Sequence, residues 1–160
     1  MSKISVKESG ILFEARDELT FVEPYGENCV RVRSTRNSKL SDERWTLLPP
    51  EEACFSVSLE SPDRAVLENG SLIVVLEKTW TGCRIEFIRD GKTVLSTREE
   101  ADPAVRYSHN EGDNYRTRVF FDPQDEHIYG LGQEQQGFFD RKGCTYDLMH
   151  RNTKSTLPVI

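Results

Sequence analysis

The sequence predicts an all-β protein, an antiparallel β-sandwich. Three observations lead to this prediction. Apolar and polar residues alternate with a period of two in several short segments, turn dipeptides separate these segments, and no long window carries the apolar stripe and caps of an amphipathic helix. Short strands that alternate in this way and are punctuated by Gly, Pro, Asn and Asp pack as two facing sheets.

The first two strands are predicted at residues 29–34 and 54–60. Val alternates with Arg in the first segment, and Phe, Val and Leu alternate with Ser in the second. Each pattern is typical of a strand with one buried and one solvated face. Between and after the strands, short helical turns are predicted at 40–48 and 122–127.

Two hairpins follow. In residues 64–77, Asn69-Gly70 separates two apolar runs, and in residues 83–96, Asp90-Gly91 does the same. Both dipeptides suit the positive φ angles of a type I′ turn. A further apolar stripe predicts a strand at 115–121.

The composition excludes several classes of function. The formal net charge of −6 disfavours nucleic acid and anionic membranes as partners, since both reward clustered Lys and Arg. No apolar run approaches the roughly 20 residues of a membrane span, and the N-terminus shows no secretion signal.

Four widely spaced cysteines without a CxxC motif predict buried free thiols, and three scattered histidines show no acid–base partner. We therefore expect a cytoplasmic protein without a metal or another cofactor.

The stretch YGLGQEQQGFFDRKG, residues 129–143, is rich in glycine, glutamine and phenylalanine. Its spacing is GxGxxxxG rather than GxGxxG, and no amphipathic helix follows, which argues against a nucleotide site. A simple turn accounts for the glycines. Amides beside aromatic rings are also what carbohydrate sites offer, so both interpretations stay open on chemistry alone.

A polar loop follows this stretch. Residues 146–148 predict a strand, residues 157–160 begin another apolar segment, and the six residues between 150 and 155 are all polar. Such a run is either a solvated loop or a dense set of hydrogen-bonding groups projected from a sheet.

The order of these segments resembles the N-terminal domain of glycoside hydrolase family 31, the family of α-glucosidases and α-xylosidases. The resemblance is carried by EHIYGLGQ, by the turn DRKG, by the aromatic YDL, by the loop RNTK and by LPVI. These motifs occupy residues 126–133, 140–143, 146–148, 151–154 and 157–160. The earlier segments 23–35 and 67–77 agree with the family in character.

The resemblance implies a galactose-mutarotase-like β-sandwich that precedes a (β/α)8 catalytic barrel. It also implies that the polar loop reaches the rim of the active site, where the residue at the position of Asn152 contacts the sugar on the leaving-group side. Many α-glucosidases carry Asp there, and the loop of this chain is more similar to the α-xylosidase branch. The implied substrate-binding residues are Asn152, Arg151 and Lys154, and the implied partners are α-linked glucosides or xylosides and the barrel itself.

The chain by itself is predicted to be inactive. A retaining glycosidase needs two carboxyl groups about 5–5.5 Å apart, and in this family both belong to the barrel, whose WxDMNE motif is absent here. Asp140, Asp147 and Glu134 lie near the glycine-rich stretch, but their spacing fixes no facing pair. Two alternatives to an accessory domain stay open: a free-standing carbohydrate-binding module, and a complete mutarotase-like enzyme.

Residues 1–160 are expected to form one N-terminal β-sandwich domain, a fragment that ends before the last strands of the sandwich. Missing strands would leave open sheet edges, which favour self-association. A homodimer through edge strands is therefore an alternative to a monomer.

Overall fold

The computed structural model describes most of the chain: residues 2–16, 18–44, 47–97, 107–109, 115–117, 125, 127–133, 137–144, 146, 150, 152, 154–157 and 159. The chain forms two compact units, Met1–Asp122 and Pro123–Ile160. Each unit is described by itself below.

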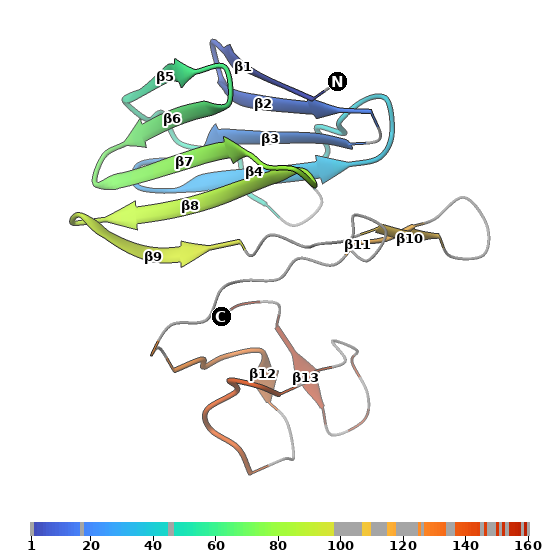
Figure 1. Cartoon of the computed structure of the whole chain (residues 1–160). Helices are drawn as coiled ribbons and strands as arrows, with labels where there is room; N and C mark the ends of the chain where they lie inside the picture. The colour runs from blue at the N-terminus through green and yellow to red at the C-terminus, as the bar shows by residue number, and fades with distance from the viewer. Residues whose placement is uncertain are drawn as a thin grey trace. The chain divides into compact units, whose positions relative to one another are not determined.

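The first unit contains two antiparallel meanders (Figure 1). One sheet consists of β1 (Lys3–Lys7), β2 (Gly10–Ala15), β3 (Glu18–Pro24) and β4 (Val30–Thr35), paired in sequence order. The other consists of β5 (Phe55–Ser61), β6 (Arg64–Asn69), β7 (Leu72–Lys78), β8 (Cys83–Arg89) and β9 (Lys92–Ser96), again in sequence order. A short hairpin of β10 (Tyr107–His109) and β11 (Tyr115–Thr117) follows.

One hydrophobic core joins the two large sheets, which confirms the predicted sandwich. Its members alternate along their strands, as the pleat requires: Ile4, Ile11, Phe13 and Val22 come from the first sheet, and Ala65, Leu67, Val74, Leu76 and Ile85 from the second. Each of these side chains is at most 4% exposed. Burying one such side chain contributes roughly 1.5–3 kcal/mol, so this cluster holds the two sheets together.

The two predicted hairpins form, and one of their turns differs from the prediction. Asp90 and Gly91 both have positive φ, 52° and 71°, as in a type I′ turn. In the other hairpin Asn69 pairs with Leu72, so the two-residue loop is Gly70-Ser71 rather than Asn69-Gly70. Gly70 at φ 60° holds the first central position, which glycine occupies in type II′ turns.

Asn69 is the last residue of β6 and not a turn residue, and its side chain makes hydrogen bonds to the β3–β4 connection. It is fully buried, and its Nδ2 donates to the carbonyls of Gly26 and Cys29, both at 2.8 Å. Asn28 complements this contact by accepting the N–H and the hydroxyl of Ser71 at 2.6 and 2.9 Å. The two asparagines therefore tie the β3–β4 turn to the β6–β7 hairpin, across the two sheets.

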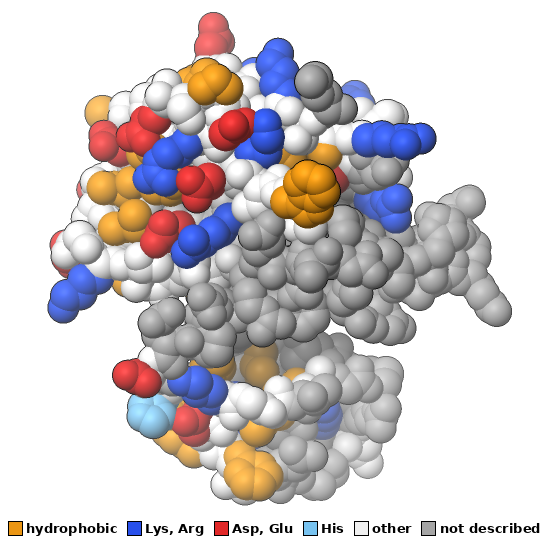
Figure 2. Space-filling model, in the orientation of Figure 1, with side chains coloured by type: hydrophobic (Ala, Val, Ile, Leu, Met, Phe, Trp, Pro, Cys, Tyr) orange, Lys and Arg blue, Asp and Glu red, His pale blue; other side chains and the backbone are white. Residues whose placement is uncertain are grey.

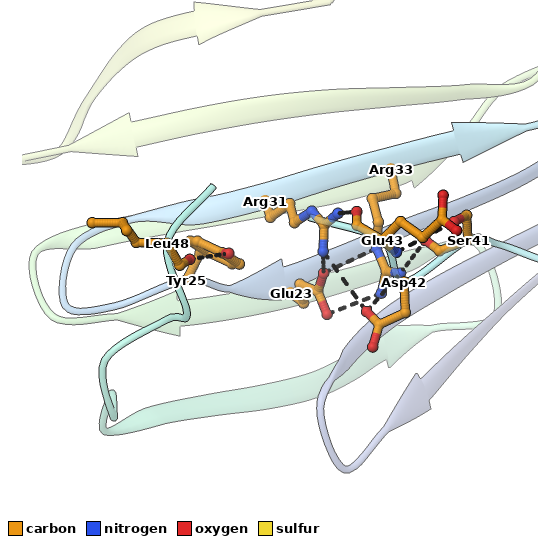
Figure 3. A network of polar contacts seen from close by, with 8 residues as sticks. All are labelled: Glu23, Tyr25, Arg31, Arg33, Ser41, Asp42, Glu43 and Leu48. Carbon is orange, nitrogen blue, oxygen red and sulfur yellow. Dashed lines mark hydrogen bonds and ion pairs between the residues drawn. The ribbon is translucent and has the colours of Figure 1, made fainter. Parts of the chain in front are cut away.

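The segment after β4 forms no helix at residues 40–44 and 47–48, but the N–H of Leu47 donates to the carbonyl of Arg44 at 3.4 Å, which agrees with a short turn in the predicted range 40–48. We call residues 41–48 the strap. Side chains of β4 and of the β3–β4 turn hold it by its main-chain carbonyls: Arg33 donates to Ser41 at 2.8 Å, Arg31 to Glu43 at 2.9 Å and Tyr25 to Leu48 at 2.5 Å (Figure 3). These long-range hydrogen bonds attach the strap to the first sheet.

The surface of the sandwich in Figure 2 shows basic and acidic side chains interspersed, not gathered into a patch of one sign. Several are paired, as Arg64 is with Glu60 at 2.7 Å and Lys78 is with Asp63. None of the four cysteines forms a disulfide, and Cys29, Cys54 and Cys144 are exposed rather than buried as predicted, since all three lie outside the strands. No described segment forms a helix that is long and apolar enough to span a bilayer.

Candidate functional site

In the second unit, main-chain pairing fixes the end of the polar loop. β12 (Gly132–Gln133) pairs antiparallel with β13 (Ser155–Thr156), so the glycine-rich stretch and the end of the polar loop form one small sheet. Leu131 extends the pairing, because its N–H donates to Val159 at 2.8 Å and its carbonyl accepts from Leu157 at 3.3 Å. These two hydrogen bonds give Leu157 and Val159 strand-like pairing, as expected for the apolar segment 157–160. Tyr146 is not in a strand, and residues 147–148 of the predicted strand lie outside the described part.

The glycines of the GLG turn serve backbone geometry. Gly130, Leu131 and Gly132 have successive positive φ angles of 112°, 63° and 87°. A Cβ on Gly132 would collide with the carbonyl oxygen of Ser155 and lie 2.8 Å from the nitrogen of Leu157. Only glycine fits this position, since both the φ angle and the neighbouring main chain exclude a side chain. Backbone geometry therefore accounts for this glycine, which lies in β12 and not in a turn.

The polar loop presents Asn152 to solvent in a turn. Lys154 follows, half-buried, and His150 is exposed with its Nδ1 3.4 Å from the N–H of Thr156. Arg151, the third predicted binding residue, lies outside the described residues. The loop thus offers an amide that can both donate and accept, and an ammonium group two residues later.

Asp140 organises the second half of the glycine-rich stretch. Its carboxylate accepts the N–H of Ile128 at 3.1 Å and of Lys142 at 3.0 Å, and its Oδ2 lies 2.7 Å from Nδ1 of His127. The hydrogen bond from His127, followed by the two main-chain donors, lowers the pKa of Asp140 from 3.8 to about 2. The expectation that no histidine has an acid–base partner is thus wrong for His127.

This pair is a turn-stabilising contact at the surface. The carboxylate accepts one N–H of its own turn, that of Lys142, and one from the segment of His127, that of Ile128. The side chains of His127 and Asp140 are 68% and 39% exposed. Glu134 and Asp147, the other two acids near the glycine-rich stretch, lie outside the described residues. Within the described residues no cluster of His, Cys, Asp or Glu is suited to a metal ion.

Aromatic rings lie beside this turn. The ring centroids of Tyr129 and Phe139 are 4.9 Å apart and the ring planes are tilted by 47°, and the centroid of the His127 ring lies 6.1 Å from that of Tyr129. Phe138 and Phe139 are 64% and 82% exposed. Gln133 is exposed nearby, whereas the neighbouring amides 135 and 136 lie outside the described residues.

The first unit has a groove of about 540 Å³ between β4 and residues 37–43. Arg31 and Arg33 line it, but acids compensate both: Arg33 Nε lies 3.0 Å from Glu23 and its Nη1 lies 3.2 Å from Asp42 (Figure 3). Arg31 lies 3.6 Å from the same Glu23 oxygen. The Arg33 Nε–Glu23 contact is an ion pair without hydrogen-bond alignment, because neither atom has a hydrogen-bond partner. The guanidinium charges therefore hold the strap and are not presented to an anion.

Comparison with known proteins gives a family match over most of the chain. A family model described as the glycosyl hydrolase 31 N-terminal galactose mutarotase-like domain matches residues 18–156. Among curated proteins, an uncharacterized family 31 glucosidase of Pseudescherichia vulneris is 28% identical, covering 100% of this chain and 34% of the relative. Alpha-xylosidase A of Aspergillus niger is 25% identical, covering 94% of this chain and 24% of the relative. The chain thus spans about a third or less of the length of these relatives.

Solved structures give the same picture. A family 31 alpha-xylosidase from a soil metagenome, crystallised with xylose, superimposes with a TM-score of 0.82 at 28% identity over 97% of this chain and 26% of that one. A family 31 dextranase from Flavobacterium johnsoniae superimposes with a TM-score of 0.61 at 18% identity, over 88% of this chain and 17% of that one. The second similarity concerns the fold alone.

Proposed function

Because this chain belongs to the glycosyl hydrolase 31 N-terminal galactose mutarotase-like domains, we propose that it is the non-catalytic N-terminal domain of a retaining, exo-acting α-glycosidase, an α-xylosidase or an α-glucosidase. In this proposal it packs on a (β/α)8 barrel of the same polypeptide and lends the barrel one loop of the substrate pocket. The observation that carries the proposal is the superposition of 97% of the chain on only 26% of an alpha-xylosidase.

The polar loop is the proposed point of contact with substrate. Asn152 is exposed in a loop whose end is fixed by the β12–β13 pairing. An amide can donate to one sugar hydroxyl and accept from another, without the charge of an aspartate. Asn152, with Arg151 and Lys154, is proposed to bind the sugar on the leaving-group side.

Exposed apolar residues support packing against a further domain. Within the second unit Phe138, Phe139, Leu157 and Val159 are between 57% and 82% exposed, and Figure 2 shows hydrophobic side chains on the drawn surface of this unit. Apolar side chains that gather on a small unit commonly mark an interaction surface. The barrel of the same polypeptide is the proposed occupant.

The catalytic carboxylates are proposed to lie outside this chain. Asp140 is committed to His127 and two main-chain N–H groups, which leaves it unsuited to act as a nucleophile. We expect the isolated chain to release no product from aryl α-glucosides or aryl α-xylosides. Turnover that a single Asp or Glu substitution abolishes would contradict this.

Asn152→Ala in the full-length protein tests the binding role. We expect the KM for an oligosaccharide to rise about three- to tenfold, the cost of one lost hydrogen bond, and the KM for an aryl glycoside to change less. Asn37→Ala, at an exposed asparagine of the first unit, is the matched control. Equal effects on both substrates would show that Asn152 does not act on the leaving-group side.

A free-standing carbohydrate-binding module is the second candidate, favoured by the exposed rings of Tyr129 and Phe139. Aromatic faces bind the C–H faces of sugars without help from a catalytic domain. Titration calorimetry of this chain with xyloglucan and malto-oligosaccharides separates the two candidates. Measurable affinity that Phe139→Ala removes would favour the module.

A further inference from the structure

The GLG turn holds the strand that ends the polar loop, and it does so through main-chain contacts. We infer that Gly132 is a positioning residue for Asn152: close approach of the β12 and β13 main chains at Gly132 sets the place of the loop that carries the amide. We call the contacts of Leu131 and Gly132 with residues 155–159 the clamp. The link to substrate rests on the proposed function, whereas the clamp itself does not.

Three contacts make the clamp. Gly132 pairs with Thr156, the Leu131 N–H donates to Val159 at 2.8 Å, and the Leu131 carbonyl accepts from Leu157 at 3.3 Å. Asn152 lies only three residues before Ser155, the partner of Gln133. A displacement of β13 is therefore transmitted to the amide through very little chain.

A second contact closes the base of the loop. The ring of His150, the first residue of the loop, lies with Nδ1 3.4 Å from the main-chain nitrogen of Thr156. The two ends of the loop are thus in contact, and Asn152 lies in a turn between them. Fixing both ends of a short loop limits the positions that its side chains can reach.

The backbone conformation at the clamp is strained and tightly packed. Leu131 is held at φ 63°, which a bulky residue rarely adopts, and glycines with positive φ flank it on both sides. Such strain persists only where surrounding contacts over-determine the conformation. The main chains are so close at Gly132 that one added methyl group would meet the Ser155 carbonyl, the Leu157 nitrogen and the Thr156 Cα. Gly132→Ala should therefore open the clamp without removing a side chain.

Gly137 provides a matched control. It lies in the same stretch, its φ is not in the left-handed region, and an added Cβ would meet nothing within 4 Å. Gly137→Ala should leave the clamp closed. Leu131→Gly should also leave it closed, since glycine adopts a positive φ without strain.

The experiment measures two quantities in the full-length protein. The first is amide hydrogen exchange at Leu131 and Leu157, whose N–H groups donate the hydrogen bonds of the clamp. We expect Gly132→Ala to accelerate this exchange at least about tenfold and Gly137→Ala to leave it unchanged. The second is the KM for an oligosaccharide, which we expect Gly132→Ala to raise about three- to tenfold with kcat on an aryl glycoside within about twofold. In an Asn152→Ala background, Gly132→Ala should raise the KM no further, because the residue that it positions is gone.

Each outcome decides a separate point. Unchanged exchange in Gly132→Ala overturns the clamp. Accelerated exchange with KM effects that add in the double variant overturns the positioning of Asn152. An Asn152→Ala enzyme with an unchanged KM overturns the proposed function and with it the positioning, while exchange still decides the clamp. If Gly132→Ala does not fold, His150→Ala opens the loop base instead and should give the same pattern with smaller changes.

Discussion

Single residues of the second unit show how few groups define its turns. Asp140 alone satisfies the main-chain N–H groups of Ile128 and Lys142, and it fixes the ring of His127 at the same time. An ionised carboxylate accepts such bonds more strongly than a neutral one, which is the reason that its proton is released at low pH. The two ends of the glycine-rich stretch thus depend on one charge.

We expect His127→Ala to raise the pKa of Asp140 from about 2 toward 3.8, because the largest cause of the lowering is removed. Since the folded-state pKa lies below the ordinary value, the carboxylate stabilises the folded state above pH 3.8, and this contribution is lost as the pH falls toward 2. Carbon-13 NMR titration of the Asp140 carboxyl measures the shift, with His150→Ala as the control. A pKa that stays near 2 in His127→Ala would assign the lowering to the main-chain donors.

The His127–Asp140 pair could not be predicted from the sequence, because thirteen residues and a reversal of chain direction separate its members. The DRKG motif predicts that Asp140 belongs to a turn. Its partner His127 comes from another segment, and such a long-range contact leaves no pattern in the local sequence. Asn69 was recognised for its place before glycine, whereas its burial depends on carbonyls some forty residues earlier in the chain. The polar loop of Asn152 could be found, since its position follows a recognisable order of motifs.

At the scale of elements, the β6–β7 and β8–β9 hairpins can be predicted from the sequence, because in each of them two apolar runs are joined by a two-residue turn. β3 is harder to predict, because three successive residues are buried. Thr20 faces the core, where Glu18 and Ser34 satisfy its hydroxyl at 2.7 Å each. Phe21 is buried on the opposite face, 5.4 Å from the guanidinium of Arg33. Burial on both faces removes the alternation on which prediction of a strand depends.

Asn69→Ala should lower the free energy of unfolding by about 1–3 kcal/mol, because the carbonyls of Gly26 and Cys29 would lose their donor in a site that water does not reach. Urea denaturation of the chain measures the difference. Asn37→Ala, at an exposed position, should leave the stability within about 0.5 kcal/mol. Equal stabilities of the two variants would show that the carbonyls find other donors.

At the scale of the whole molecule, the first unit is held together by the core between its two sheets. Most strands contribute one or two fully buried residues to it, so no single hairpin can be removed without exposing the apolar face of its neighbour. In the described part of the chain, β1 and β4 border one sheet and β5 and β9 the other. Self-association through these edges stays a prediction, which a light-scattering mass at high concentration tests.

Leu67→Ala should destabilise the chain by about 2–5 kcal/mol, the usual cost of a cavity at a fully buried leucine. The Leu67 side chain is 0% exposed in the centre of β6, whereas that of Leu48 in the strap is 83% exposed. Leu48→Ala is therefore the control and should change the stability little. Thermal unfolding followed by circular dichroism compares the two. Similar melting temperatures would mean that the sheets can close over the missing side chain.

The attachment of the strap has a practical consequence. The strap is held through its main-chain carbonyl oxygens, which accept hydrogen bonds from Tyr25, Arg31 and Arg33. Because every amino acid provides a carbonyl, the side chains of Glu43 and Leu48 can be changed while these hydrogen bonds remain. Both positions can therefore be substituted, for example by charged residues, without loss of the sandwich beneath. Asp42, whose carboxylate pairs with Arg33, is the position to conserve.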